Sequence, residues 1–342
     1  MNKKIFDLQL FAELNTNVTT STGTGNNLSA EMKTYYDMTL IDEASAKLVH
    51  QQFGQKRPIP KNGGKTIEFR RFANLPKAMT PLTEGVTPNG NKLDVTAVSA
   101  TVSQYGDYIV QSDVLELTAL DNTIIEAAKV LGNQAGLTLD TVVRNVLIGG
   151  TNVNYCPKVA EDGTETAVTS RSALDKTCRL TVKQVQKAVA KLRANNAPTI
   201  DGYYVAIVHP YVAYDLMRDP EWVDAHKYTT SENIYEGEIG KIAGVRFVET
   251  SEAAIITGSG TPTGLAVFCT IILGNNAYGV TEVTGGGLET IVKQKGSAGT
   301  GDPLNQRSSI GWKALLTAER LVENYMVRVE SCSEYSSTAQ AN

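Results

Sequence analysis

The sequence predicts an α+β fold in which an extended hairpin and a long helix accompany a compact α/β region. Three observations support this prediction. Apolar residues alternate within residues 54–110, a helical apolar pattern runs without interruption over residues 121–148, and strand-like and helix-like segments mix after residue 181. The chain has 342 residues, of which 42% are hydrophobic and 20% charged, so it is long enough to bury a sizeable core.

Residues 1–28 are predicted to form a flexible N-terminal arm and residues 29–53 a helix. The arm contains a polar run rich in Gly, Thr and Asn, which buries too little apolar surface to offset the entropy lost on ordering. Ser29 is typical of a helix N-cap. After it, apolar side chains recur every four residues and predict a helix that continues to about residue 52: Met32, Tyr36, Leu40, Ala44 and Leu48.

Residues 54–110 are predicted to form an extended hairpin. Its first part, GQKRPIPKNGGKTIEFRRF, begins with turn-forming residues and then alternates apolar Ile67 and Phe69 with polar neighbours, as a half-buried strand does. A loop rich in Pro, Thr and Gly leads to a second strand region that ends at Val110. Because a two-stranded ribbon is marginally stable in water, it must lie on its own domain or on a neighbouring molecule.

Residues 121–148 carry the strongest helical signal, from a cap at Asp121 to the Gly149-Gly150 stop. A helix of this length is about 40 Å long. Gly132 and Gly136 lie one turn apart in it and permit another segment to approach closely. The apolar side chains recur at spacings of three and four: Ile124, Ala128, Leu131, Ala135, Leu139, Val142 and Val146.

A separate α/β domain is predicted from residue 181. Thr181 and Gln184 form a capping box for a helix that starts at residue 182. Buried strands are predicted over residues 202–210, 242–250 and 264–274, with a short helix after the first, and one or two further strands over 310–331.

The basic stretch at residues 54–72 holds six basic residues and one acid, whereas the whole chain has a net charge of −4. That balance argues against an overall field that attracts DNA, so the stretch must act locally. A nucleic-acid grip, a localisation signal, solvated charge and a surface for another subunit are the alternatives. The basic residues flank a turn and a strand without the aromatic interleaving of nucleic-acid readers, which favours a contact with carboxylates of another subunit.

The sequence predicts no catalytic, cofactor-binding or metal-binding residues, and therefore no enzyme. The four cysteines are scattered and are expected to be buried free thiols. His209, near Asp215, fits either a general base with its orienting carboxylate or a strand-end histidine satisfied by the backbone, and we favour the second. No membrane role is expected, since the longest apolar run, residues 265–273, is too short to span a bilayer.

Several phrases, together with the order of the parts, resemble the major capsid proteins of tailed bacteriophages, whose fold is shared with herpesvirus capsids and encapsulin shells. They are FDLQLFAE at residues 6–13, FGQKRPIPKNGGKTIEFRRF at 53–72, PLTEGVTP at 81–88, QYGDYIVQSDVLELT at 104–118, GEIGKIAGVRFVET at 237–250 and DPLNQRSSIGWKA at 302–314. They span most of the chain. Residues 152–179 carry no phrase of this kind.

The resemblance implies the tailed-phage major capsid fold. Residues 54–110 would be the E-loop that lies across a neighbouring subunit, 111–180 the peripheral domain with its spine helix, 181–309 the axial domain, and 310–342 the return strands of the peripheral domain and a C-terminal tail. The candidate intersubunit contacts are then five residues of the basic stretch and one acid of the loop that follows it: Arg57, Lys61, Lys65, Arg70, Arg71 and Glu84.

The implied function is self-assembly into hexamers and pentamers that form an icosahedral shell around packaged double-stranded DNA, bound without sequence specificity. The expected partners are other copies of the chain and portal, scaffold and decoration proteins, with no cofactor and no membrane. The expected location is the virion capsid, assembled in the host bacterial cytoplasm. An encapsulin-like nanocompartment and a hydrolase that uses His209 are the alternatives.

Overall fold

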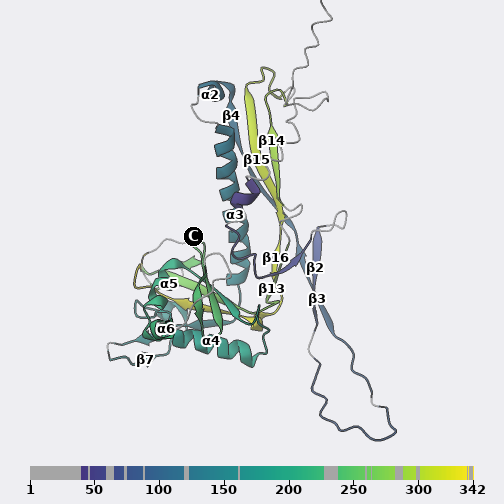
Figure 1. The fold of residues 1–342 in the computed structure, drawn as a ribbon, viewed down its shortest axis with the longest axis vertical. Coiled ribbons are helices and arrows are strands. Elements are labelled where there is room, and N and C mark those ends of the chain that lie inside the picture. Colours follow the sequence, from purple (N-terminus) through teal and green to yellow (C-terminus); the bar gives the residue numbers. More distant parts are fainter. Residues whose placement is uncertain are drawn as a thin grey trace, which may run out of the picture. The chain divides into compact units, whose positions relative to one another are not determined.

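The computed structural model describes residues 40–342 except 45–46, 59–64, 73–74, 88, 119–122, 161, 227–237, 259, 263, 282–287, 298–300, 337 and 339–341. The chain forms two compact units (Figure 1). The first contains residues up to 44, 106–135 and 289–313, and the second contains 45–105, 136–288 and 314–342. The expected N-terminal arm at residues 1–28 lies outside the described residues.

The long helix α3, Thr123–Ile148, confirms the strongest helical prediction. In the first unit it packs against the described part of the N-terminal helix, residues 40–44. A Cβ on Gly132 would lie 2.8 Å from the carbonyl oxygen of Leu40, so this glycine is what permits the close approach. Residues 47–53 contain turns and no helix, so the helix does not continue to residue 53 as the sequence predicted.

A three-stranded sheet accompanies the N-terminal half of α3 in the order β14-β15-β4. Its strands are β14 (Leu288–Lys293), β15 (Arg307–Leu316) and β4 (Ser103–Ser112), and the short helix α2 (Asp113–Thr118) follows β4. Gln134 on α3 donates to Asp107 at 2.7 Å and accepts from the Trp312 indole N–H at 3.4 Å. The sequence predicted that the second strand region of the hairpin continues to Val110, but from residue 103 onward this region is β4, which pairs with β15.

The second unit is built on a seven-stranded sheet in the order β5-β17-β12-β8-β10-β9, with β11 also paired to β12. Figure 1 shows the helices α4, α5 and α6 gathered around it. The strands are β5 (Val153–Tyr155), β8 (Tyr204–Val208), β9 (Glu238–Ile242), β10 (Val245–Glu249), β11 (Ile255–Ile256), β12 (Val267–Leu273) and β17 (Met326–Ser331), and the helices are α4 (Val182–Ala194), α5 (Pro210–Met217) and α6 (Pro220–His226).

The centre of this sheet is apolar. Every residue of β8 and β12 is buried, which confirms the strands expected there. β12 is antiparallel to both β8 and β17, whereas β10 runs parallel to β8. The return strands expected over residues 310–331 include β17, which pairs with β12. Its Val327 and Val329 belong to the core of this sheet, and their burial accounts for that placement.

Two sets of contacts in the second unit were not predicted from the sequence. Thr181 makes no side-chain cap for α4: the Gln184 N–H donates to the Thr181 backbone carbonyl at 3.0 Å, and the Val182 N–H donates to Asp219 at 2.9 Å. The fully buried Glu330 on β17 receives both Nε and Nη2 of Arg171, at 2.7 and 2.6 Å. Arg171 begins the 3-10 turn η2 (Arg171–Ala173), so this ion pair fixes a segment that no sequence motif identified.

Three smaller groups of strands complete the second unit. β1 (Gln55–Arg57) pairs in parallel with β13 (Tyr278–Thr281), which is antiparallel to β16 (Ala318–Arg320). β2 (Thr66–Phe72) and β3 (Val95–Thr101) form an antiparallel hairpin, and β6 (Lys158–Val159) pairs with β7 (Glu165–Thr166). A 3-10 turn, η4 (Glu323–Tyr325), precedes β17.

Candidate functional site

The base of the β2–β3 hairpin is a small apolar core. Ile67 and Phe69 point inward with Ala100 and pack against Leu321 and Val322. Gly279 of β13 lies directly beneath Phe69: a Cβ there would fall far inside contact distance of the aromatic ring. The alternation in the sequence therefore correctly predicts which face of β2 is buried, and the glycine shows where that face is seated.

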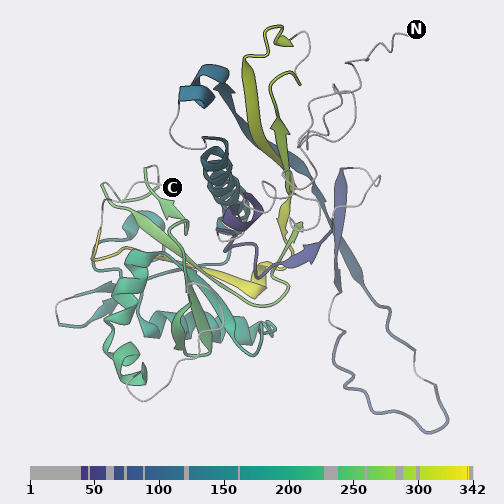
Figure 2. The same ribbon diagram turned by 45° about the horizontal axis from the view of Figure 1, so that its top comes forward.

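Beyond this base, residues 75–94, which we call the hairpin arm, form neither helix nor strand where they are described. Figures 1 and 2 show the arm leading away from β2 and β3. Met79 is 80% exposed and Leu82 is 78% exposed, and Leu75, Val86 and Leu93 are also more than half exposed. An exposed apolar segment of this kind is characteristic of a surface that another molecule covers.

The tip of the hairpin arm is a defined turn. The Val86 N–H donates to the Thr83 carbonyl at 3.2 Å, and Gly85 has a φ of 76°, which a residue with a side chain rarely adopts. Glu84 is exposed at the first central position of this turn. The turn therefore presents one carboxylate at the end of the arm.

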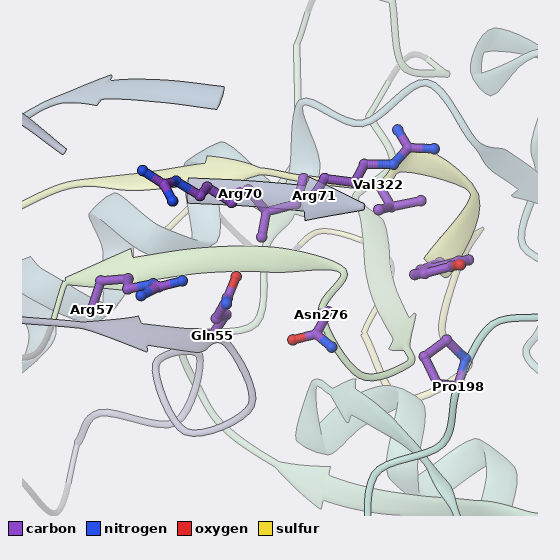
Figure 3. Close-up of a pocket in the computed structure, with 9 residues that line it drawn as sticks. Gln55, Arg57, Arg70, Arg71, Pro198, Asn276 and Val322 are labelled. Atoms are coloured by element: carbon purple, nitrogen blue, oxygen red, sulfur yellow. The ribbon is translucent and has the colours of Figure 1, made fainter. Parts of the chain in front are cut away.

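A pocket of about 320 Å³ lies beside the base of the hairpin (Figure 3). Figure 3 shows Arg70 and Arg71 extending in opposite directions from adjacent positions on β2, with Arg57 on the same side as Arg70. The lining, which we call the arginine pocket, combines these cations with polar and apolar residues: Gln55, Arg57, Arg70, Arg71, Pro198, Asn276, Leu321, Val322 and Tyr325.

The charge of the arginine pocket is uncompensated within the described part of the chain. No acidic side chain lines it, and no ion pair between described residues involves Arg57, Arg70 or Arg71. Other arginines of the second unit differ, since Arg171 and Arg320 each hold a carboxylate within 2.7 Å. A concave site with several guanidinium groups and an apolar wall is suited to an anionic group carried on an apolar segment.

The predicted contact residues divide into three groups. Arg57, Arg70 and Arg71 come together in the pocket, and Glu84 lies at the arm tip. Lys65 is exposed just before β2 but does not line the pocket. Lys61 lies outside the described residues. Sequence reasoning missed the residues that form the rest of the pocket, such as Pro198, Asn276 and Tyr325, because they come from segments distant in the chain and carry no local signal.

His209 has the environment of a structural residue. It is the N-cap of α5, where its Nδ1 accepts the Tyr211 N–H at 3.2 Å, and its ring packs 5.0 Å from that of Phe268. Burial lowers the pKa of His209 to about 4. Asp215 accepts the Glu334 N–H at 3.1 Å, and so it serves the chain near residue 334. This geometry favours the strand-end interpretation over a base with an orienting carboxylate.

The remaining chemistry-bearing groups are buried. All four cysteines are free and buried, and burial raises the pKa of the Cys178 thiol to about 11 and of the Cys269 and Cys332 thiols to about 12. Such thiols stay protonated and unreactive. Among the described residues no group of His, Cys, Asp and Glu is arranged to hold a metal ion. Nor does any described helix combine the length and apolarity needed to cross a membrane.

Comparison with solved structures identifies the fold as that of phage capsid proteins. The capsid of Ralstonia phage GP4 superimposes with a TM-score of 0.64 at 13% identity, covering 83% of this chain and 88% of that one. The capsid of the cyanophage P-SCSP1u gives a TM-score of 0.60 at 14% identity, with 84% and 89% covered. The head of Helicobacter pylori bacteriophage KHP40 gives 0.57 at 13%, with 81% and 87% covered.

The family follows from the sequence itself. The family model described as phage capsid protein matches residues 111–295, more than half of the chain. The chain therefore belongs to the phage capsid protein family, and the resemblance noted from its sequence is confirmed. A search of curated protein sequences finds no significant match.

Proposed function

We propose that this chain is a major capsid protein whose copies assemble into hexamers and pentamers and close an icosahedral shell around packaged double-stranded DNA. Membership of the phage capsid protein family supports this function. The observation that carries it is the hairpin arm, an extended segment whose large apolar side chains are exposed in a single copy of the chain.

The energetics of the hairpin arm favour association. Full burial of one large apolar side chain contributes about 1.5–3 kcal/mol, and the arm exposes five such side chains: Leu75, Met79, Leu82, Val86 and Leu93. A two-stranded ribbon has little stability of its own to hold this segment in place. Contact with a neighbouring copy would both order the arm and cover it.

The first unit offers an apolar surface that fits such an arm. On β4 and α2, the side chains of Tyr108, Val110, Val114 and Leu117 are exposed, and Leu117 is 83% exposed. A concavity of about 360 Å³ on the sheet is lined by Tyr108, Ile291 and Trp312. We infer that this face receives the part of a neighbouring copy's hairpin arm that carries Leu75, Met79 and Leu93, so that two apolar surfaces of one sequence cover each other at each contact.

The remaining parts of the proposal concern the contents and partners of the shell. The net charge of −4 gives the chain no overall field that attracts DNA, so the DNA would be enclosed by the shell and not held by sequence-specific contacts. Portal, scaffold and decoration proteins would complete the particle, which would assemble in the host bacterial cytoplasm. Analysis of the nucleic acid and protein inside purified particles separates this function from a compartment that encloses enzyme cargo.

The experiment that tests the proposal replaces Met79 and Leu82 with Asp together. Both side chains are exposed, so the subunit should fold with an unchanged thermal melt, but charge on the arm should abolish shells in sedimentation and electron microscopy. The matched control exchanges Met79→Leu and Leu82→Met, which keeps the apolar surface and should assemble normally. Normal shells from the Asp variant would overturn the proposal.

A further inference from the structure

The tip of the hairpin arm and the arginine pocket have complementary chemistry. At the tip, Glu84 stands between Leu82 and Val86, two exposed apolar residues. The turn closed by the bond from Val86 to Thr83 holds these residues in one compact projection. The arm tip is therefore a carboxylate flanked by apolar side chains.

The arginine pocket likewise combines a charged part with an apolar part. Arg57 and Arg70 lie on one side of it (Figure 3), and Leu321, Val322 and Tyr325 contribute apolar or aromatic surface to its lining. Its volume of about 320 Å³ is at the lower end of the range for pockets that hold small ligands, and accommodates a few side chains. Guanidinium groups bind carboxylates in a planar, paired geometry that lysine does not reproduce.

We propose that the Glu84 turn of one copy docks in the arginine pocket of a neighbouring copy. This inference rests on the proposed function, because it names the partner of the arm tip within the assembled shell. The pocket of the same copy is a poor partner: it lies at the base of the hairpin, and the arm leads away from that base in both views (Figures 1 and 2). In a homo-oligomer every copy contributes one tip and one pocket, so the contact repeats throughout the assembly.

Docking of the Glu84 turn in the arginine pocket is expected to affect closure of the shell more than the stability of the subunit. Arg57, Arg70 and Glu84 are all exposed in the single copy, and none of them belongs to its apolar core. Reversal of their charges should therefore leave folding intact. At the docked contact the same changes place like charges against each other, which opposes association.

A charge exchange tests the pairing. Arg57→Glu with Arg70→Glu should reduce shell yield by about tenfold or more, and so should Glu84→Arg, because each leaves like charges facing. The chain that combines all three substitutions has matched charges again at every contact and should recover most of the yield. Lys176→Glu, an exposed charge reversal outside both the hairpin arm and the arginine pocket, is the control and should assemble normally.

The outcomes separate this inference from the proposed function. Recovery in the combined variant, with unchanged subunit melts throughout, supports docking of Glu84 in the pocket. If the Asp substitutions at Met79 and Leu82 abolish shells but Glu84→Arg assembles normally, the arm drives assembly and the pairing is wrong. Normal shells that contain less DNA in the Arg57→Glu, Arg70→Glu variant would place the pocket against the genome, which also overturns the pairing.

Discussion

The β2–β3 hairpin and the seven-stranded sheet belong to the same unit but are stabilised in different ways. All seven residues of β12 are buried, and they pair with strands on both sides. Among the hairpin residues whose side chains are described, Ile67, Phe69 and Ala100 are the buried ones, and all three lie at its base. The sheet is buried within its own unit, whereas the hairpin is packed only at its base and exposes its other end to solvent. A protein that assembles needs both kinds of element, one to fold and one to be completed by a partner.

The largest expected contrast comes from truncating one side chain in each region. Phe247 in β10 is fully buried with its ring 5.5 Å from that of Trp222, so Phe247→Ala should lower the free energy of unfolding by about 3–5 kcal/mol. Met79→Ala on the hairpin arm should change it by less than about 0.5 kcal/mol. Urea denaturation of unassembled subunits measures both. A large loss in Met79→Ala would mean that the arm packs on its own subunit.

The junction between the two kinds of structure should show an intermediate effect. Gly279→Ala drives a Cβ into the Phe69 ring, and the resulting displacement should lower the free energy of unfolding by about 1–3 kcal/mol. Hydrogen exchange should quicken in β2 and β3 more than in β8 and β10. Gly90→Ala on the arm is the control, since nothing lies within 4 Å of that position. An equal loss of hydrogen-exchange protection in β2, β3, β8 and β10 would show that Gly279 does not anchor the hairpin locally.

The smallest expected effect is a pH dependence of the subunit's stability. Burial lowers the pKa of His209 from 6.5 to about 4 in the folded chain, so between these values the unfolded chain binds a proton that the folded chain does not. His209 should therefore stabilise the fold least at low pH: its contribution falls as pH drops from about 6.5 towards 4 and is constant above that window.

His209→Asn keeps a side-chain acceptor at the helix N-terminus but does not titrate. The wild type should lose free energy of unfolding relative to this variant only inside the window, in denaturation curves collected from pH 4 to 8. Parallel curves would show that His209 is not protected from protonation by the fold. An unchanged shell yield at neutral pH is expected for the same variant, and loss of shells would give His209 a role in assembly.

The sequence predicted what local periodicity determines. The apolar spacing over residues 121–148 matches α3 because a helix of that length is encoded by neighbours three and four residues apart. The uncharged run at 264–274 likewise matches β12. Strand partners were not predictable in this way. β4 pairs with β15 and β17 with β12, across separations that leave no trace in a local pattern.

The residues of the candidate site also differ in whether the sequence alone could identify them. The basic residues of β1 and β2 were identifiable because they cluster in the sequence, and the structure gathers Arg57, Arg70 and Arg71 into one pocket. The opposite wall, with Pro198 and Tyr325, depends on the tertiary fold alone. The same holds for Asp219, which accepts the Val182 N–H at the start of α4 although it lies far from this helix in the sequence. A capping rule identifies the helix end but not the group that satisfies it.

The packing beneath the hairpin also has a consequence for the order of synthesis. Ile67 and Phe69 are made early, yet the core that holds them includes Leu321 and Val322, and the sheet nearby gains β17 only with residues 326–331. A nascent chain therefore contains the hairpin arm long before it contains the residues against which the base of the hairpin packs. Anchoring of the arm therefore requires complete synthesis, because a copy whose translation stops early cannot present a correctly anchored arm to a growing shell.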